Sequence, residues 1–446
     1  MKLLYSLIIL LFLNSCSFDN RTGIWKNNSE ISVKDDNNKK ILKDFKTLSI
    51  SSELFDKEIP LNNKFKFRLS PAINNLEWND VFFQYNNNSR NFKFGDLNKL
   101  ILKSKKLSRH KINNNILYKD NLLIASDVKG SIILFSIKEN KVIQKFNFYK
   151  KKYKDIEKIL NIIVEKNIIF ISDNVGYLYA YDFKKNNILW ANNLKIPFSS
   201  NLKIAGNKLL LSNQNNSIFF IDKLTGEILK MIPTEEISLK NQFTNNLSLN
   251  KEKNLLFFLN TYGSLYSIKI NSMSINWFIN LNQSTNINPN SLFFSNQIVN
   301  DRKRIIISSN QSLYLVDADS GSILKKYNFA VKIKPIIIDG YFFLITKNNL
   351  IICVGLKNGE IIYSYSIKDD LNKFLNIEKK KVEYRDMFIL NNNIFIFLKD
   401  SYLIKYDIKG RFKHFKKLPS KIQSLPIVID KFILYLNNKN KIFVYG

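Results

Sequence analysis

Residues that could carry out chemistry are scarce in this sequence of 446 residues. It has two cysteines, Cys16 and Cys353, which form no CxxC pair, and two histidines, His110 and His414. Zinc and haem sites and most catalytic triads draw on clusters of such residues. A His-rich metal centre is therefore excluded, and a His-based triad is not expected. Cys353 lies within an apolar run, where we expect it to be a small buried hydrophobic residue.

Acidic residues recur at the ends of apolar runs and not in pairs suited to acid–base catalysis. The segment that starts at Asp317 and Asp319 begins like a calcium loop. Its twelfth position is Asn328, however, where an EF-hand needs a bidentate Glu. We interpret this segment as a turn between strands, and the other recurring Asp residues as turn caps. We thus predict no catalytic residue, no metal site and no cofactor.

The chain is strongly basic, with 68 Lys and Arg against 37 Asp and Glu and a net charge of +31. Such a balance can indicate a nucleic-acid partner or an anionic surface. The positive charge is spread along the whole chain together with abundant asparagine, and it does not form blocks. We attribute part of it to compositional bias and expect no nucleic-acid partner. The 45% of hydrophobic residues is enough for a sizeable folded core.

The N-terminus has the pattern of an export signal. Its apolar run, residues 3–13, is shorter than the roughly 20 residues that span a bilayer. Residues 13–16, Leu-Asn-Ser-Cys, resemble the bacterial lipoprotein box, which implies removal of residues 1–15 and lipidation of Cys16. An ordinary secretory signal that contains a Cys is the alternative. Ser17, in place of Asp, follows the Cys, which by the same resemblance implies the periplasmic face of the outer membrane.

Residues 16–64 are polar and charged, and we expect them to form the lipidated N-terminus and a flexible linker. The folded body is then residues 65–446. Within it one pattern recurs: a short apolar run, a turn, a second apolar run and usually a polar residue. Consecutive copies end about 44 residues apart on average. The eight copies end at residues 136, 182, 222, 269, 317, 355, 407 and 446.

Runs of four to six apolar and β-branched residues without a helical period predict strands. A tight turn follows the second run, as at Asp222 to Gly226, where Asp caps its own backbone and Gly takes a positive φ. In the turn after Asp182 we expect Asn187 to replace this glycine. The turn leads into a further strand, so each unit is predicted to be a small antiparallel sheet.

Units of this length with about four strands are typical of β-propellers. We therefore predict an all-β fold, an eight-bladed β-propeller with four-stranded antiparallel blades, preceded by a signal peptide and a polar linker. The last copy, residues 432–446, stops where its outer strand should begin. We expect residues 97–107 to supply this strand and close the ring.

The repeats lack the Gly-His, Trp-Asp and Gly-Gly dipeptides of other propeller types. Residues 177–190, 218–230 and 265–277 resemble the pyrroloquinoline-quinone (PQQ) type of repeat. Residues 75–89, which contain Trp78, resemble the stretch before the first blade in alphaproteobacterial members of one family, with Asn in place of the usual glycines. Together with the lipoprotein box and the spacer, these features resemble the BamB-like family of outer-membrane protein assembly lipoproteins.

This resemblance implies a non-catalytic scaffold of the outer-membrane β-barrel assembly machinery. Such a protein is held at the periplasmic face of the outer membrane by its lipid. It binds the periplasmic POTRA domains of the barrel-forming subunit BamA and aids insertion of outer-membrane proteins. The resemblance does not indicate which face or loops bind the partner.

Two alternatives stay open. One is a PQQ-dependent quinoprotein dehydrogenase, a class with similar repeats that holds its quinone in the central cavity, commonly beside vicinal cysteines. This chain has no Cys-Cys pair. The other is a generic envelope propeller that binds a different periplasmic partner.

Overall fold

The computed structural model describes residues 16–18, 25–27, 55–95, 99–149, 153, 155–236, 243–282, 292–375 and 382–446. The chain divides into two compact units, residues 1–52 and 53–446. In the first unit, β1 (Cys16–Phe18) pairs antiparallel with β2 (Trp25–Asn27). The expected signal peptide, residues 1–15, lies outside the described residues, as does most of the expected linker up to residue 54.

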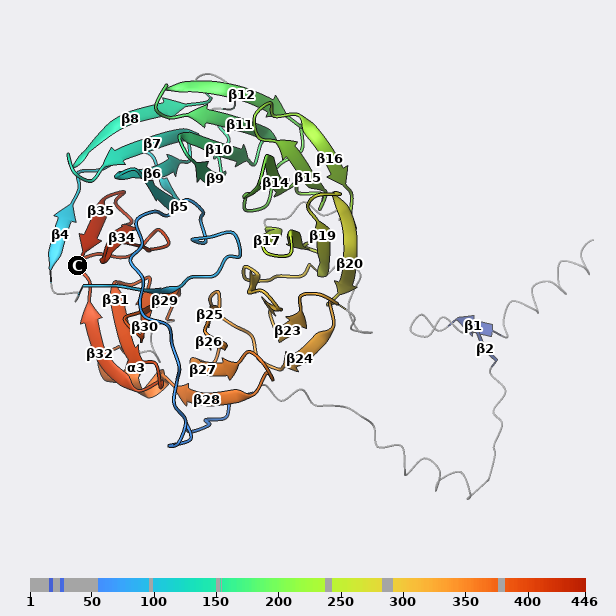
Figure 1. Cartoon of the computed structure of the whole chain (residues 1–446), viewed down its shortest axis with the longest axis vertical. Coiled ribbons are helices and arrows are strands. Elements are labelled where there is room, and N and C mark those ends of the chain that lie inside the picture. Colours follow the sequence, from blue (N-terminus) through green and yellow to red (C-terminus); the bar gives the residue numbers. More distant parts are fainter. Residues whose placement is uncertain are drawn as a thin grey trace, which may run out of the picture. The chain divides into compact units, whose positions relative to one another are not determined.

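The described part of the second unit forms eight sheets arranged as the blades of a propeller, which confirms the predicted fold class (Figure 1). Each blade has four antiparallel strands that follow one another outward from the centre. The first blade consists of β5 (Ile112–Lys119), β6 (Leu122–Asp127), β7 (Ser131–Ser136) and β8 (Lys141–Asn147). The second consists of β9 (Leu160–Glu165), β10 (Ile168–Asp173), β11 (Tyr177–Asp182) and β12 (Asn187–Asn193).

The next three blades repeat this order along the chain. The third has β13 (Lys203–Ala205), β14 (Lys208–Ser212), β15 (Ile218–Asp222) and β16 (Ile228–Ile232). The fourth has β17 (Asn246–Asn250), β18 (Leu255–Leu259), β19 (Ser264–Lys269) and β20 (Ser274–Asn280). The fifth has β21 (Val299–Asn300), β22 (Arg304–Ser308), β23 (Leu313–Asp317) and β24 (Ile323–Tyr327).

Of the last three blades, the seventh and the eighth include strands from both ends of the unit. The sixth has β25 (Ile336–Ile338), β26 (Tyr341–Ile345), β27 (Leu350–Gly355) and β28 (Ile361–Ser366). The seventh has β29 (Tyr384–Leu390), β30 (Asn393–Leu398), β31 (Tyr402–Asp407) and β32 (Phe412–Lys417), and β3 (Asn91–Phe92) adds a parallel inner strand. The eighth has β33 (Ile427–Ile429), β34 (Phe432–Leu436), β35 (Ile442–Tyr445) and, outermost, β4 (Leu100–Lys103).

Strand β4 closes the ring, as the sequence predicts. It pairs antiparallel with β35, so that Leu102 faces Val444. Hydrogen bonds of 3.0 and 3.2 Å between the backbones of Lys99 and Gly446 extend this pairing to the last residue of the chain. The eighth blade is thus assembled from residues more than 300 positions apart.

The turn between the third and fourth strands of a blade follows the predicted chemistry. In Asp222, Oδ1 accepts hydrogen bonds from the backbone N–H groups of Leu224 and Thr225, and Gly226 has a φ of +81°. One assignment is wrong: after Asp182 the residue with positive φ is Asn186, at +54°, and not Asn187, which begins β12. The reason is that the left-handed residue stands four positions after the capping Asp, and Asn186 occupies that position.

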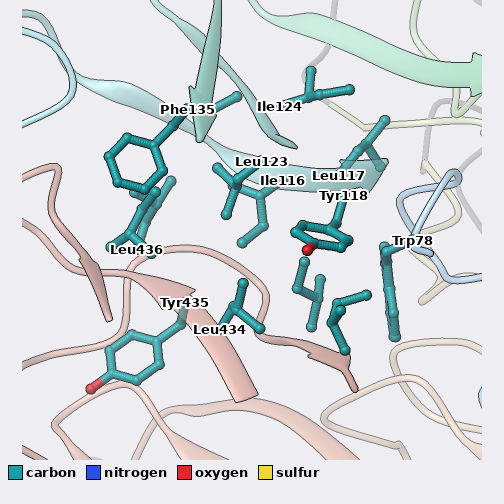
Figure 2. Packing of buried hydrophobic residues seen from close by; sticks show 14 of the residues in the cluster. Trp78, Ile116, Leu117, Tyr118, Leu123, Ile124, Phe135, Leu434, Tyr435 and Leu436 are labelled. Carbon is teal, nitrogen blue, oxygen red and sulfur yellow. The ribbon is translucent and has the colours of Figure 1, made fainter. Parts of the chain in front are cut away.

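The middle strands of each blade are buried on both faces because every blade packs between two others. In β10, for example, five of the six residues are buried. Side chains from the first and eighth blades interdigitate in one cluster, where Leu117, Leu123 and Phe135 meet Leu434 and Leu436 (Figure 2). The outer strands are different, and most residues of β8, β12, β16 and β24 are exposed.

One short helix, α3 (Lys368–Phe374), lies in the connection between the sixth and seventh blades. Phe374 stacks on Phe412 and Phe415 of β32, with ring centroids 5.7 and 4.4 Å apart, so the helix covers part of that outer strand. Within the described residues, no helix combines the length and apolar character needed to cross a bilayer.

Candidate functional site

Residues 75–95, here called the axial segment, run around the centre of the ring (Figure 1). Hydrogen bonds of 2.7 to 3.3 Å join this segment to every blade in turn. From the eighth blade through the first to the seventh, the bonded pairs are Asn75 O and Asp430 N, Trp78 N and Tyr118 O, Asn79 O and Val164 N, Gln84 O and Lys203 Nζ, Tyr85 O and Leu249 N, Asn86 O and Asn300 N, Asn88 Nδ2 and Ile337 O, and Phe92 O and Asn391 N. The chain itself therefore occupies one end of the ring's axis.

Asparagine side chains of the axial segment add further contacts with the blades because an amide offers a donor and an acceptor, as a peptide group does. Asn88 shows this most clearly: its Nδ2 donates to the backbone O of Ile337 at 2.8 Å, and its Oδ1 accepts from the N of the same residue at 2.9 Å. Asn87 donates to the backbone oxygens of Leu247 and Ile298, at 2.8 and 2.9 Å, and so links the fourth blade to the connection before the fifth. The side chains thus replace a paired strand.

Trp78 anchors the axial segment in the core. It is 3% exposed and packs against Phe83, Phe92 and Phe388, with ring centroids 4.8 to 6.1 Å apart. It lies beside Tyr118 at the edge of the cluster between the first and eighth blades (Figure 2). The Trp-led stretch singled out in the sequence is therefore a structural element of the ring.

A buried ion pair holds the same segment to the third blade. Lys203 Nζ lies 2.6 Å from Asp80 Oδ2, and the Lys203 side chain is fully buried. Burial lowers the pKa of Lys203, while the carboxylate of Asp80 acts in the opposite direction. No spacing in the sequence links these two positions, so the pair could not have been predicted.

The residues first considered for chemistry are not brought together. His110 and His414 are exposed, and Cys353 is fully buried, which raises the pKa of its thiol. Asp317 accepts the backbone N–H groups of Asp319 and Ser320 at 3.0 and 3.1 Å, which confirms its interpretation as a turn cap. In the parts of the chain that the structure describes, no group of three or more His, Cys, Asp or Glu residues could hold a metal ion.

The outer strands of the first five blades, together with the turn that leads into β16, expose apolar side chains, and we call this surface the outer wall. Each member is between 36 and 70% exposed. The members are Val142, Ile143, Ile188, Leu189, Leu224, Ile228, Leu229, Met231, Ile275, Phe278, Ile323 and Leu324. Lysines stand among them, including Lys230, Lys325 and Lys326. Each of the five outer strands carries two or three of these side chains, and such a concentration can mark a protein-binding surface.

The sixth blade shows how such an outer strand can be covered. Ile59 pairs with Ser364 of β28 through backbone hydrogen bonds of 2.8 and 2.9 Å. Phe55 packs on Phe329, and the backbone N–H of Leu61 donates to the hydroxyl of Tyr365 at 2.7 Å. An extended segment can therefore bind along the outside of a blade by main-chain pairing.

Comparison with known proteins gives the family and the fold. A family model described as the outer membrane protein assembly factor BamB matches residues 128–365, just over half of the chain. No curated protein sequence matches.

Among solved structures, BamB from Moraxella catarrhalis is similar, with a TM-score of 0.60 and 11% identity over 78% of this chain and 99% of that one. Quinohemoprotein alcohol dehydrogenase from Comamonas testosteroni is also similar, with a TM-score of 0.60 and 10% identity over 83% of this chain and 80% of that one. The computationally designed protein Ika8 matches with a TM-score of 0.58 and 11% identity over 78% of this chain and 99% of that one. At these identities the solved structures establish the propeller fold alone.

Proposed function

The chain belongs to the family of the outer membrane protein assembly factor BamB, and from this premise we propose that it is a non-catalytic scaffold lipoprotein of the outer-membrane β-barrel assembly machinery. In this proposal a lipid on Cys16 holds it at the periplasmic face of the outer membrane. The propeller binds the POTRA domains of a BamA-like barrel-forming subunit and aids insertion of outer-membrane proteins.

The observation that carries the proposal is the outer wall of the first five blades. It combines exposed apolar side chains with strand edges that other chains can pair with. The axial segment bonds to all eight blades and so holds the wall as one rigid surface. A preorganised surface of this kind loses little conformational entropy when a partner binds, which favours a scaffold role.

The proposal can be tested by affinity capture from detergent-solubilised envelopes. The lipidated protein should recover the BamA-like subunit. The Phe278→Asp variant should recover several-fold less of it, since a charge in the outer wall would be buried against the partner. Ile159→Asp is the matched control, because both side chains are 59% exposed but Ile159 lies outside the wall.

Failure of the wild-type protein to recover the BamA-like subunit would contradict the assembly role. Recovery of a different periplasmic protein in its place would support the generic envelope propeller.

The quinoprotein alternative is favoured only by the propeller fold that it shares with this chain. It can be tested with the purified protein by adding PQQ and an artificial electron acceptor dye. Reduction of the dye by an alcohol substrate, dependent on PQQ, would support the enzyme and count against a purely structural role.

A further inference from the structure

A cavity lies near the beginnings of the inner strands. It has a volume of about 270 Å³, and residues just before these strands or within their first halves line it. Val81 and Phe82 of the axial segment also border it. A second cavity of about 180 Å³ shares Phe82, Gln297, Arg385 and Leu425 with the first. The two therefore adjoin each other, and we call them together the axial cavity.

Amide side chains dominate the wall of the axial cavity. Those that border it are Asn114, Asn115, Asn161, Asn201, Asn245, Asn246, Asn296 and Gln297. Both amide atoms of Asn201 already bond to the backbone of Leu247. An amide can donate and accept hydrogen bonds, so the remaining side chains suit a ligand with polar groups of either kind. Apolar contacts with Phe82 and Leu425 are available beside them.

The charges around the axial cavity are mainly positive. Lys332, Lys334 and Arg385 border it, against the single carboxylate of Asp386. Lys203 and Asp80, which lie nearby, neutralise each other as an ion pair. An anion in the cavity would therefore meet an excess of positive charge.

Two of these cations are available to a ligand. The Nε of Arg385 donates to the backbone O of Ser424 at 3.1 Å, and within the described residues its other guanidinium nitrogens have no hydrogen-bond partner. Lys334 has no hydrogen bond with a described residue, although the carboxylate of Asp386 lies close enough to raise its pKa against the effect of burial. Burial lowers the pKa of Lys334 and of Arg385 and raises the pKa of Asp386, which indicates that water solvates these groups poorly. Charge-assisted hydrogen bonds are strongest in such surroundings.

We propose that the axial cavity is a binding site for a carboxylate group, which Arg385 and Lys334 hold while the surrounding amides bind the rest of the ligand. A guanidinium matches a carboxylate through two parallel hydrogen bonds, which favours this anion. The volume lies at the lower end of the range for small-molecule pockets, about 300–1,000 Å³, so the site fits one small organic acid or one acidic side chain of a polypeptide. This inference does not depend on the assembly role.

The test is isothermal titration calorimetry of the full mature chain with three probes. Citrate represents a free organic acid. A Gly-Glu-Glu-Gly peptide with both ends blocked represents an acidic polypeptide, and Gly-Gln-Gln-Gly with the same blocked ends is its neutral control. We expect one or both acidic probes to bind and the neutral peptide not to bind. Binding of citrate alone identifies the free acid as the source, and binding of the acidic peptide identifies a polypeptide.

Two variants, Arg385→Gln and Lys334→Met, should each weaken this binding by about 10- to 100-fold, the range of one hydrogen bond to a charged group. Matched controls, Arg302→Gln and Lys439→Met, remove an exposed cation elsewhere and should leave the affinity unchanged. Thermal unfolding of each variant shows whether it is folded. Absence of binding by both acidic probes, or binding that neither variant weakens, would overturn the proposal.

Discussion

At the scale of single residues, the ion pair between Asp80 and Lys203 offers a sharp test of the axial segment. Asp80→Asn would leave a buried ammonium without its carboxylate, which typically costs about 3–5 kcal/mol. We expect urea denaturation to show a loss of this size. The double variant Asp80→Asn, Lys203→Met should recover most of the lost stability, because it also removes the buried charge. A single variant as stable as the wild type would show that the pair is not buried in solution.

Asp173 is a residue whose titration should affect stability near neutral pH. Its carboxylate accepts the backbone N–H groups of Val175, Gly176 and Tyr177 in the turn between β10 and β11, and the Tyr149 hydroxyl donates to it. Burial raises its pKa to about 6, despite the opposing effect of the backbone hydrogen bonds.

Because the pKa of Asp173 is higher in the folded state, this group stabilises the fold fully at low pH and loses that contribution as the pH rises through about 6. Between pH 5 and pH 7 the loss should be about 1 kcal/mol. Asp173→Asn should abolish this part of the pH dependence and keep the turn, since Asn213 and Asn260 cap the equivalent turns of the next two blades. Urea denaturation of both proteins at pH 5 and pH 7 measures this change in the free energy of unfolding. A variant with the same pH dependence as the wild type would refute the assignment of the change to Asp173.

At the scale of elements, ring closure depends on a strand of four residues, β4. Leu102 is partly buried against the cluster between the first and eighth blades, whereas the adjacent Ile101 is 49% exposed. Leu102→Asp should therefore cost about 1–3 kcal/mol of unfolding free energy, and Ile101→Asp, the matched control, should cost much less. Limited proteolysis should cut the Leu102 variant faster near residues 95–107. If both substitutions cost the same free energy of unfolding, Leu102 would not face the core and Ile101 the solvent, as the pairing of β4 with β35 requires.

The strands of the blades could be predicted from the sequence because their signals are local. Apolar runs mark them, and an Asp followed four positions later by Gly marks the turns, as at Asp222 and Asp317. The pairing of β4 was also predictable, since the final unit visibly lacks a strand. The error at Asn187 was one of counting positions within the turn, and it does not alter the element.

The axial segment and the axial cavity could not be predicted in the same way. Residues 75–95 have neither strand nor helix periodicity, and their partners lie up to about 350 positions away along the chain. The amide side chains that bind the fourth, sixth, seventh and eighth blades look like ordinary polar loop residues until the ring brings the inner strands together. The cations of the cavity, Lys334 and Arg385, are likewise two among 68 basic residues. Only the closed ring shows which of them face one another.

At the scale of the whole molecule, the axial segment turns eight similar sheets into a single unit. A blade alone exposes both of its apolar faces, so its stability depends on its two neighbours. The axial segment adds bonds from one continuous stretch of chain to every blade, which couples blades that do not touch. This coupling suits a scaffold, because a partner bound along the outer wall meets surfaces at fixed distances from one another.

The charge of the whole molecule gives the last prediction. Lysines such as Lys325 and Lys326 stand in the outer wall, so an acidic partner surface would be attracted to it over a distance that salt shortens. The Debye length falls from about 14 Å at 50 mM salt to about 6 Å at 300 mM. Recovery of the partner should therefore fall several-fold between these two conditions. In the double variant Lys325→Gln, Lys326→Gln it should fall less, because part of the attraction is already absent. Recovery that does not change with salt would mean that apolar contact alone holds the partner and that the +31 charge plays no part in binding.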